Sequence, residues 1–157
     1  MRFSAVFDRR RRPTSTTTLP KFRPARTLTV SIAASAASVY AFIADPRRLP
    51  EWATGLGSSP TPLPDGAWRV ETPTGPMRAV FAPPNEFGVV DHIVIPLTGG
   101  APAVDVPLRV VPNGTGSEVM LTVFQQAGMS DAQFAADTAL VQADLERLKH
   151  ALEHRPE

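Results

Sequence analysis

The 157-residue chain contains no cysteine, and this absence excludes several kinds of chemistry at once. Without a thiol there is no disulfide framework, no zinc–thiolate centre and no cysteine nucleophile. No apolar run approaches the roughly 20 residues that cross a bilayer as a helix. A glycine-rich phosphate loop, a nucleophile elbow and a catalytic carboxylate pair are missing too. The three histidines suggest no metal constellation, and we expect neither a metal nor a cofactor.

The net charge of +1 is unevenly distributed along the chain. Residues 1–26 carry eight basic residues and one acidic residue, a net charge of +7, so the remainder carries −6. Because this tail lacks the apolar stretch of a secretory signal, we expect a disordered basic extension; a basic anchor for anionic partners is the alternative. Residues 27–154 are then the folded domain. Its acidic balance argues against nucleic-acid binding, and we expect a cytoplasmic protein that is a monomer or homodimer.

The apolar spacing changes early in the domain, which predicts a strand followed by two short helices. Apolar and hydroxyl residues alternate over 27–32, the period of a half-buried strand. The spacing becomes helical over 39–43, with Ser35 as a plausible N-cap. Asp45-Pro46 ends this helix, because the residue before a proline is pushed out of the α region. The same pair can begin the second helix, which ends near Trp52.

The middle of the chain predicts an antiparallel meander. Short apolar segments alternate with turns rich in glycine and proline, and short connections force antiparallel neighbours. The expected strands, the first of them a degenerate edge strand, cover residues 56–63, 67–72, 76–82, 88–96, 103–111 and 117–125.

The C-terminal segment, residues 131–154, predicts one long amphipathic helix. Ser130 and Gln133 form a capping-box pattern at its start. An apolar stripe then follows a 4-3-4-3-4 spacing, which suits a helix that covers a sheet. The stripe consists of Phe134, Thr138, Val141, Leu145, Leu148 and Leu152. We expect the charged residues Asp137, Asp144, Glu146, Arg147 and Lys149 to lie away from it.

Two stretches resemble a known superfamily. The phrase VYAFIADP at 39–46, followed by LPEW at 49–52, resembles the helix pair of the START-related helix-grip superfamily (SRPBCC), which includes polyketide cyclases and pathogenesis-related plant allergens. Ala136-Asp137 and ADLERLK at 143–149 resemble the terminal helix of its bacterial members. The resemblance covers about residues 27–154. It implies an α+β fold in which a seven-stranded antiparallel sheet wraps around the long C-terminal helix, with two short helices after the first strand and an apolar cavity inside.

The positions of the turns predict the strand register. A turn near Gly99-Gly100 would place Asp91 opposite Arg109, where the two could form a cross-strand ion pair. A turn near Gly114-Thr115 would place Arg109 opposite Met120. Charged residues usually mark the wet face of a sheet, so these registers put the charges outside.

The opposite face then carries His92 among apolar residues that look into the cavity. His92 could act as a general acid or base or as a hydrogen-bond anchor for a ligand, or it could be an ordinary buried histidine. A register shift of one residue would instead bring Asp91 and Arg109 into the cavity as a polar anchor. Trp52 and Trp68 either line the cavity or belong to the plain core, which is the more usual role. Thr138 could bond a ligand, but a threonine in a helix more often donates to its own helix. The residues expected to line the cavity are Phe42, Trp52, Trp68, Met77, Phe81, His92, Leu108, Leu121, Thr138 and Val141.

Three functions fit this sequence. The favoured interpretation is binding or carriage of a small hydrophobic molecule, such as a lipid, an aromatic or a polyketide-like compound, because the implied cavity has few polar groups. The second is an enzyme of the cyclase or dehydratase type that uses His92 as its acid or base, by analogy with the superfamily. The third is a co-chaperone-like or toxin-like protein that binds a partner through an exposed apolar patch.

Overall fold

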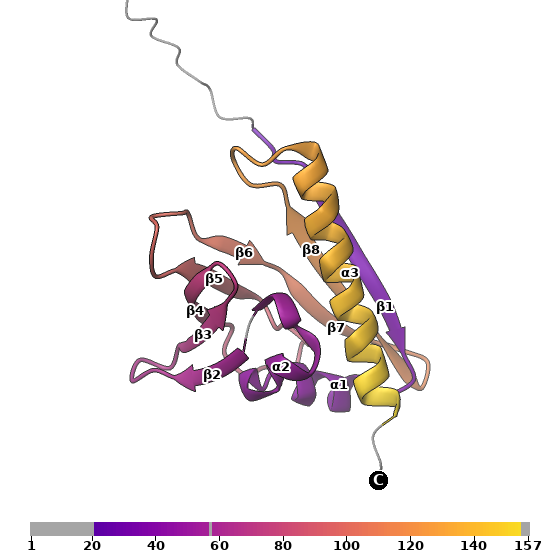
Figure 1. Cartoon of the computed structure of the whole chain (residues 1–157). Helices are drawn as coiled ribbons and strands as arrows, with labels where there is room; N and C mark the ends of the chain where they lie inside the picture. Colours follow the sequence, from indigo (N-terminus) through magenta and orange to yellow (C-terminus); the bar gives the residue numbers. More distant parts are fainter. Residues whose placement is uncertain (1–20, 57, 155–157) are drawn as a thin grey trace, which may run out of the picture.

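The computed structural model describes residues 21–56 and 58–154 and confirms the α+β class. The predicted basic extension lies largely outside the described residues. Figure 1 shows the arrangement of helices and strands. The strands are β1 (Ala25–Ile32), β2 (Ser58–Pro62), β3 (Trp68–Thr72), β4 (Gly75–Phe81), β5 (His92–Pro96), β6 (Val104–Val106), β7 (Leu108–Asn113) and β8 (Gly116–Phe124). The helices are α1 (Ala36–Ile43), α2 (Leu49–Trp52) and α3 (Asp131–Glu153), with 3-10 turns η1 (Pro46–Arg48) and η2 (Thr54–Leu56) beside α2.

The two short helices after β1 begin and end as the sequence predicts. The Ser35 hydroxyl accepts a hydrogen bond from the backbone N–H of Ser38 at 3.2 Å and caps α1. The Asp45 carboxylate accepts from the backbone N–H of Arg47 at 3.1 Å, and Pro46 opens η1. The chain therefore turns at Asp45-Pro46 and runs through η1 into α2, which ends at Trp52.

The expected single seven-stranded sheet is wrong, because the strands form two sheets. One has the order β1-β8-β7 and the other the order β2-β3-β4-β5-β6. The strand predicted over 103–111 breaks at Pro107, which has no N–H to donate to a ladder. β6, before the break, pairs with β5, whereas β7, after it, pairs with β8. The one predicted strand thus passes from one sheet into the other.

Backbone contacts join the two sheets beside this break. Val90 N–H donates to the Leu108 carbonyl and Val110 N–H donates to the Gly88 carbonyl, both at 2.9 Å. Gly88 has φ +70°, and a Cβ at this position would lie 1.9 Å from the Val110 carbonyl oxygen. Only glycine fits such a close approach at a positive φ. The Asp91 carboxylate also accepts from the Leu108 N–H at 2.9 Å, so a side chain replaces part of the interrupted ladder.

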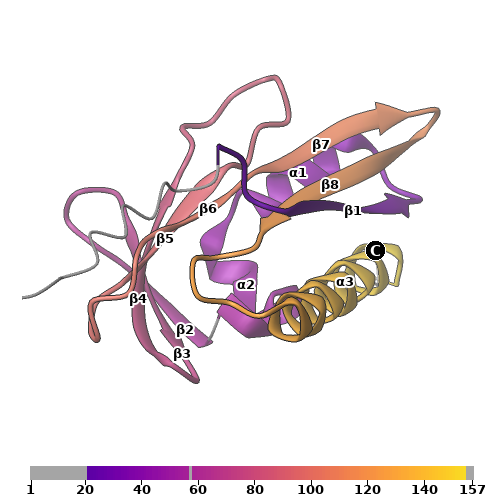
Figure 2. The same cartoon turned by 90° about the horizontal axis from the view of Figure 1, so that it is seen from above.

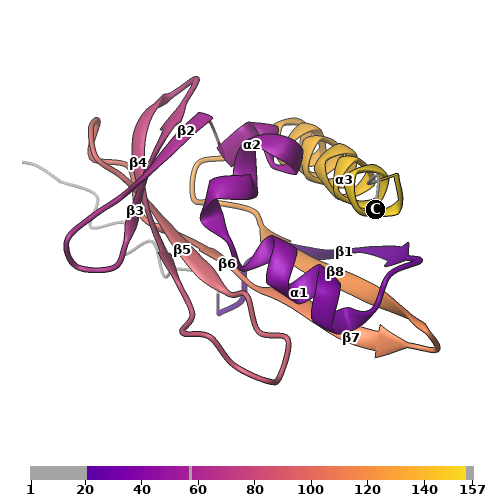
Figure 3. The ribbon, with the colours of Figure 1, turned by 90° about the horizontal axis from the view of Figure 1, so that it is seen from below.

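The long helix α3 covers the concave side of the sheets. Figure 2 shows α2 and α3 on that side, and Figure 3 shows α1 against β7 and β8. The predicted capping box is present: the Ser130 hydroxyl accepts from Gln133 N–H at 3.1 Å, and the Gln133 side chain accepts from Ser130 N–H at 2.8 Å. The predicted stripe faces inward, with Phe134, Thr138, Leu145 and Leu148 buried.

One residue of α3 lies where it was not expected. Asp144, predicted to point away from the apolar stripe, is buried. Its carboxylate accepts a hydrogen bond from the Thr54 hydroxyl at 3.1 Å, and Arg147 of the same helix lies 3.2 Å from it. This contact ties α3 to η2. Among the described residues, no helix combines the length and apolar character needed to cross a membrane.

Candidate functional site

The strand register places His92 on the inner face of the five-stranded sheet, the face turned toward α2 and α3. His92 pairs with Phe81 of β4 and with Val106 of β6. The turn near Gly99-Gly100 thus sets a register two residues away from the expected one, which would have paired His92 with Leu108. A shift of two residues preserves the faces, because side chains alternate with period two.

Asp91 and Arg109 form an ion pair, although the strand register does not place them directly opposite each other. Their side chains are 39% and 40% exposed, so the pair lies at the surface. Asp91 faces away from the side that His92 occupies, since the two are neighbours in an extended segment. The alternative in which these two charges line the interior is therefore wrong.

The His92 side chain is almost completely buried, with 3% of its surface exposed. Its ring stacks on that of Phe81, with centroids 4.8 Å apart and planes 30° apart. Its neighbours along the strand, Val90 and Val94, are also buried, whereas its cross-strand neighbours Phe81 and Val106 are only half-buried. The inner face is therefore less completely buried on the two neighbouring strands than along the strand that carries His92.

The hydrogen bond of His92 defines its tautomer. Nδ1 lies 3.0 Å from the Val90 carbonyl oxygen, which can only accept a hydrogen bond. Nδ1 therefore carries the proton. Burial lowers the pKa of His92, and the hydrogen bond to Val90 offsets only part of this effect. The neutral ring then presents Nε2 as an acceptor, and this buried atom has no hydrogen-bond partner among the described residues.

The two sheets differ in how fully their inner faces are covered. On β7 and β8, the inner residues Leu108, Val110, Val119, Leu121 and Val123 are all buried. On the five-stranded sheet, Val70, Ala79 and Val94 are buried, but Trp68, Met77, Phe81, Val104 and Val106 are half-buried. Helix α3 packs on β1 of the smaller sheet, so its cover does not extend over the whole of the larger one. The apolar neighbours of His92 on the adjacent strands, Phe81 and Val106, pack against the main core cluster but are thus only half-buried.

The structure brings some of the predicted lining residues to this inner wall and leaves others in the core. Met77, Phe81 and His92 share the inner face of the five-stranded sheet with Trp68, which pairs with Ala79 of β4. The other predicted residues belong to α1, α2, β7, β8 and α3. Of these, Phe42, Trp52, Leu108 and Leu121 are buried members of the main core cluster, and half-buried Val141 packs against it.

Two polar side chains of the predicted set have contrasting partners. The Thr138 hydroxyl donates to the Phe134 carbonyl at 2.7 Å, the helix bond expected for an ordinary threonine in this position. The indole Nε1 of Trp52, by contrast, is buried with no hydrogen-bond partner among the described residues. Buried indole N–H groups normally donate to something. Trp52 Nε1 and His92 Nε2 therefore offer one unused donor and one unused acceptor.

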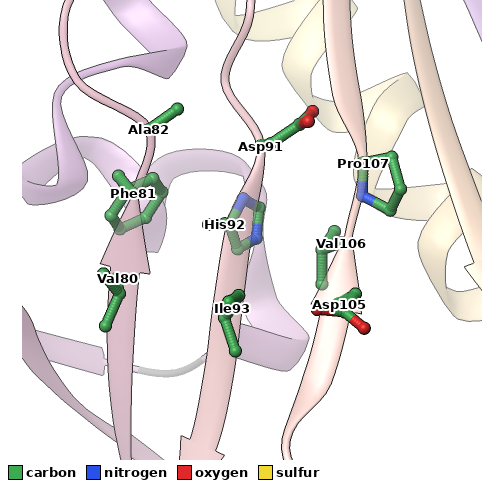
Figure 4. Close-up of a pocket in the computed structure, with 9 residues that line it drawn as sticks. All are labelled: Val80, Phe81, Ala82, Asp91, His92, Ile93, Asp105, Val106 and Pro107. Atoms are coloured by element: carbon green, nitrogen blue, oxygen red, sulfur yellow. The ribbon is translucent and has the colours of Figure 1, made fainter.

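Hollows also open at the surface of the described residues. One of them, of about 370 Å³, is lined by Val80, Phe81, Ala82, Asp91, His92, Ile93, Asp105, Val106 and Pro107 (Figure 4). Of these residues, Val80, Ile93 and Asp105 lie side by side on the outer face of β4, β5 and β6. Val80 and Ile93 are 37% and 40% exposed, which is ordinary for apolar side chains at a protein surface. Another hollow, of about 600 Å³, lies between η1 and β2 and is lined in part by Trp68.

The cluster around Asp144 was missed in the sequence. Burial raises the pKa of Asp144, and the hydrogen bond from Thr54 and the charge of Arg147 act in the opposite direction. Arg147 donates from Nη2 to the Thr54 hydroxyl at 2.9 Å, which closes a three-residue network between α3 and η2. Its only signal in the sequence is the position of Asp144 next to Leu145 at the edge of the apolar stripe. The network is structural, since it joins two elements.

Histidines at the end of α3 form a separate pair. The rings of His150 and His154, four residues apart, stack with centroids 4.2 Å apart. Within residues 21–56 and 58–154 there is no group of three or more histidine, aspartate or glutamate side chains that could hold a metal ion. The pair is therefore not part of a recognisable metal site.

Comparison with known proteins shows the fold. No protein-family model matches the chain, and no curated protein matches it. Among solved structures, a START superfamily protein from Mycobacterium smegmatis is 14% identical, with 82% of this chain and 97% of that chain covered and a TM-score of 0.61. The Aha1 dimer from Colwellia psychrerythraea is 16% identical, with 83% and 97% covered and a TM-score of 0.63. Ara h 8.0201 is 13% identical, with 82% and 97% covered and a TM-score of 0.63.

These likenesses confirm the predicted resemblance at the level of the fold. The chain shares the α+β fold of these structures, in which strands and short helices pack around a long C-terminal helix. Identities of this size carry no information on ligand or activity.

Proposed function

We propose that the protein binds a small hydrophobic molecule, such as a lipid, an aromatic or a polyketide-like compound, on the inner face of the five-stranded sheet. The observation that supports this is the half-buried state of Phe81 and Val106, the cross-strand neighbours of His92, and of Met77 further along the same face. A folded chain normally buries such inward-facing side chains, as this one does on β7 and β8.

A bound apolar molecule would complete the burial of this wall. Each square ångström of apolar surface removed from water contributes about 25 cal/mol, so covering these half-buried side chains would favour binding. The wall has few polar groups, which is the usual composition of a site for a hydrophobic ligand. The related folds include a START superfamily protein, consistent with this interpretation.

Ligand carriage can be tested directly by native mass spectrometry of freshly purified protein, followed by organic extraction of any bound compound. Binding of 2-methoxynaphthalene, an apolar probe, can be measured by fluorescence. Val106→Thr puts a hydroxyl on the inner wall without changing its shape. Val80→Thr makes the same change on the outer face of the neighbouring part of the sheet and serves as the matched control.

We expect Val106→Thr to weaken probe binding severalfold and Val80→Thr to leave it unchanged. Equal effects of the two substitutions, or larger ones at Val80, would contradict binding on the inner face. Absence of both a co-purified compound and probe binding would contradict a carrier function altogether.

A second candidate function is proton transfer at His92. A neutral imidazole with its Nε2 lone pair unused is suited to remove a proton from a carbon next to a carbonyl group. The buried N–H of Trp52 is the kind of donor that stabilises an enolate, provided that both groups reach one ligand.

The test uses 2-tetralone in deuterium oxide, whose exchange at the carbon next to the carbonyl is followed by proton NMR. Acceleration by the wild-type protein and loss of that acceleration in His92→Gln would support an enzyme. Exchange no faster than in buffer, with the probe bound, would leave carriage as the function.

A further inference from the structure

We infer that the inner wall selects, among hydrophobic molecules, those with a neutral hydroxyl group, and that this hydroxyl donates a hydrogen bond to Nε2 of His92. The inference rests on the proposed function, since it assumes that a ligand reaches the inner face. It names the chemical class of that ligand as alcohols and phenols.

The first step is the direction of the hydrogen bond that His92 needs. The Val90 carbonyl fixes the proton on Nδ1, 3.0 Å away, so Nε2 has a lone pair and no hydrogen. Nε2 can accept a hydrogen bond but cannot donate one. A ligand with only acceptor atoms, such as an ether, an ester or a carboxylate, gives this atom nothing.

The second step is the position of Nε2 in the fold. The ring is 97% buried, and the atom has no partner among the described residues. The half-buried side chains of Phe81 and Val106 flank the ring on the neighbouring strands, so incompletely buried apolar surface adjoins it. A molecule that covers these two side chains therefore passes over the imidazole.

The protein itself supplies no hydrogen-bond donor to Nε2 among the described residues. The nearest charged groups in the sheet, Asp91 and Asp105, occupy the outer face, and carboxylates are acceptors. Asp91 already accepts from Leu108 N–H and from Arg109. The Thr138 hydroxyl donates to its own helix. The unused N–H of Trp52 does not bond to Nε2 either, since both atoms lack a hydrogen-bond partner among the described residues. A donor on the ligand is thus the partner that fits.

The charges around His92 narrow the class of ligand further. His92 has no cationic neighbour on the inner face of its own strands, where the residues are apolar. A carboxylate placed against a neutral nitrogen lone pair would be desolvated without any compensating bond. The wall should therefore discriminate against fatty-acid-like anions and favour neutral alcohols or phenols of similar size.

The experiment compares three probes of one size: 2-naphthol, 2-methoxynaphthalene and 2-naphthoate. Dissociation constants are measured for the wild type, for His92→Phe, which keeps an apolar ring, and for His92→Gln, which keeps an acceptor. A single hydrogen bond gained on binding corresponds to about 3- to 10-fold in affinity. We expect 2-naphthol to bind the wild type more tightly than 2-methoxynaphthalene by this factor, and 2-naphthoate to bind most weakly.

In His92→Phe the preference for 2-naphthol should disappear while 2-methoxynaphthalene still binds, and His92→Gln should restore part of the preference. If His92→Phe does not fold, nitrogen NMR of the wild-type imidazole decides. Addition of 2-naphthol should then shift the Nε2 resonance, and addition of 2-methoxynaphthalene should not shift it toward the hydrogen-bonded position.

The outcomes separate the two proposals. If 2-naphthol and 2-methoxynaphthalene bind the wild type equally well, or if 2-naphthoate binds best, the inference is overturned while hydrophobic binding stands. If none of the three probes binds, the proposed function itself fails.

Discussion

The rings of Phe81 and His92 stack across two neighbouring strands, with their centroids 4.8 Å apart. The aromatic ring covers one side of the imidazole and helps to keep water from it. Together with the bond from Nδ1 to the Val90 carbonyl, this packing holds His92 as a neutral ring with a defined tautomer. The arrangement leads to a prediction about stability as well as to one about binding.

The first prediction concerns the pH dependence of folding. Because burial lowers the pKa of His92 in the folded protein, the unfolded chain takes up the proton first, near pH 6.5, as the pH falls. Stability from the neutral ring is thus present above this pH and lost as the pH drops toward the folded pKa. Below pH 6.5 we expect the free energy of unfolding of the wild type to fall by up to about 1.4 kcal/mol per pH unit more than that of His92→Gln. Urea unfolding at a series of pH values measures this. If the free energies of unfolding of the two proteins change in parallel with pH, the prediction is wrong.

The second prediction concerns the junction of the two sheets. Gly88→Ala places a methyl group 1.9 Å from the Val110 carbonyl oxygen at φ +70°, so the two sheets must separate locally. We expect a loss of more than about 3 kcal/mol in the free energy of unfolding. Gly99→Ala is the control, because Gly99 also has a positive φ but nothing within 4 Å, and about 1 kcal/mol is expected there. Similar losses at both sites would show that the close approach is unimportant.

The third prediction concerns the network between α3 and η2. Thr54→Val removes the hydroxyl that donates to Asp144 and accepts from Arg147. We expect the protein to lose about 1–2 kcal/mol in the free energy of unfolding at neutral pH, since buried Asp144 loses one of its hydrogen bonds. The pKa of Asp144 should rise further, because that bond favours its charged form. Carbon NMR of the carboxylate measures this, and Thr115→Val in an exposed turn is the control.

The fourth prediction concerns the loop before β5. The Asn85 side chain donates to the carbonyls of Pro83 and Val89 and accepts from the N–H groups of Phe87 and Val89, all within 3.0 Å. This closed set of bonds presents Phe87 to solvent with 81% of its surface exposed. We expect Asn85→Ala to lower the free energy of unfolding by about 2–3 kcal/mol and to speed amide exchange in the loop.

Exposed Asn113 provides the control for this loop, and Asn113→Ala should change stability by less than about 0.5 kcal/mol. Unchanged amide exchange at Phe87 and Val89 in Asn85→Ala would contradict the role of the side chain as the centre of the loop.

The sequence predicts most of this fold because several local signals are strong. The capping pattern of Ser130 and Gln133 and the apolar stripe behind it locate α3 to within one residue of its observed end. The tight turn at Gly114-Thr115 fixes the register of β7 with β8, and Arg109 pairs with Met120 as expected. A short hairpin leaves the strands no freedom to slide.

Other features depend on contacts that the sequence does not reveal. The connection through Gly99-Gly100 is longer, so the pairing of β5 with β6 could shift by two residues without moving any side chain to the other face. Pro107 was a visible signal for a strand break, but only the pairing of its neighbours shows that it divides one sheet into two. The burial of Asp144 depends on where η2 packs, which lies far away in the sequence.

For the site, the sequence predicts the burial of His92 but not its surroundings. Alternation alone puts His92 on the apolar face, so its burial follows from the sequence. Its tautomer depends on the distance to Val90, and the incomplete burial of its cross-strand neighbours depends on how far α3 extends over the larger sheet. Neither the distance to Val90 nor the extent of α3 over the larger sheet can be obtained from residue spacing.

Methyl NMR of the wild-type protein during titration with 2-naphthol tests the central claim most directly. If the ligand lies on the inner face, the methyl resonances of Met77 and Val106 shift with a common dissociation constant. Those of Val80 and Ile93, on the outer face of the same sheet, should stay in place. Shifts confined to Val80 and Ile93, or no saturable shift at any of the four, would contradict the binding of a hydrophobic molecule beside His92.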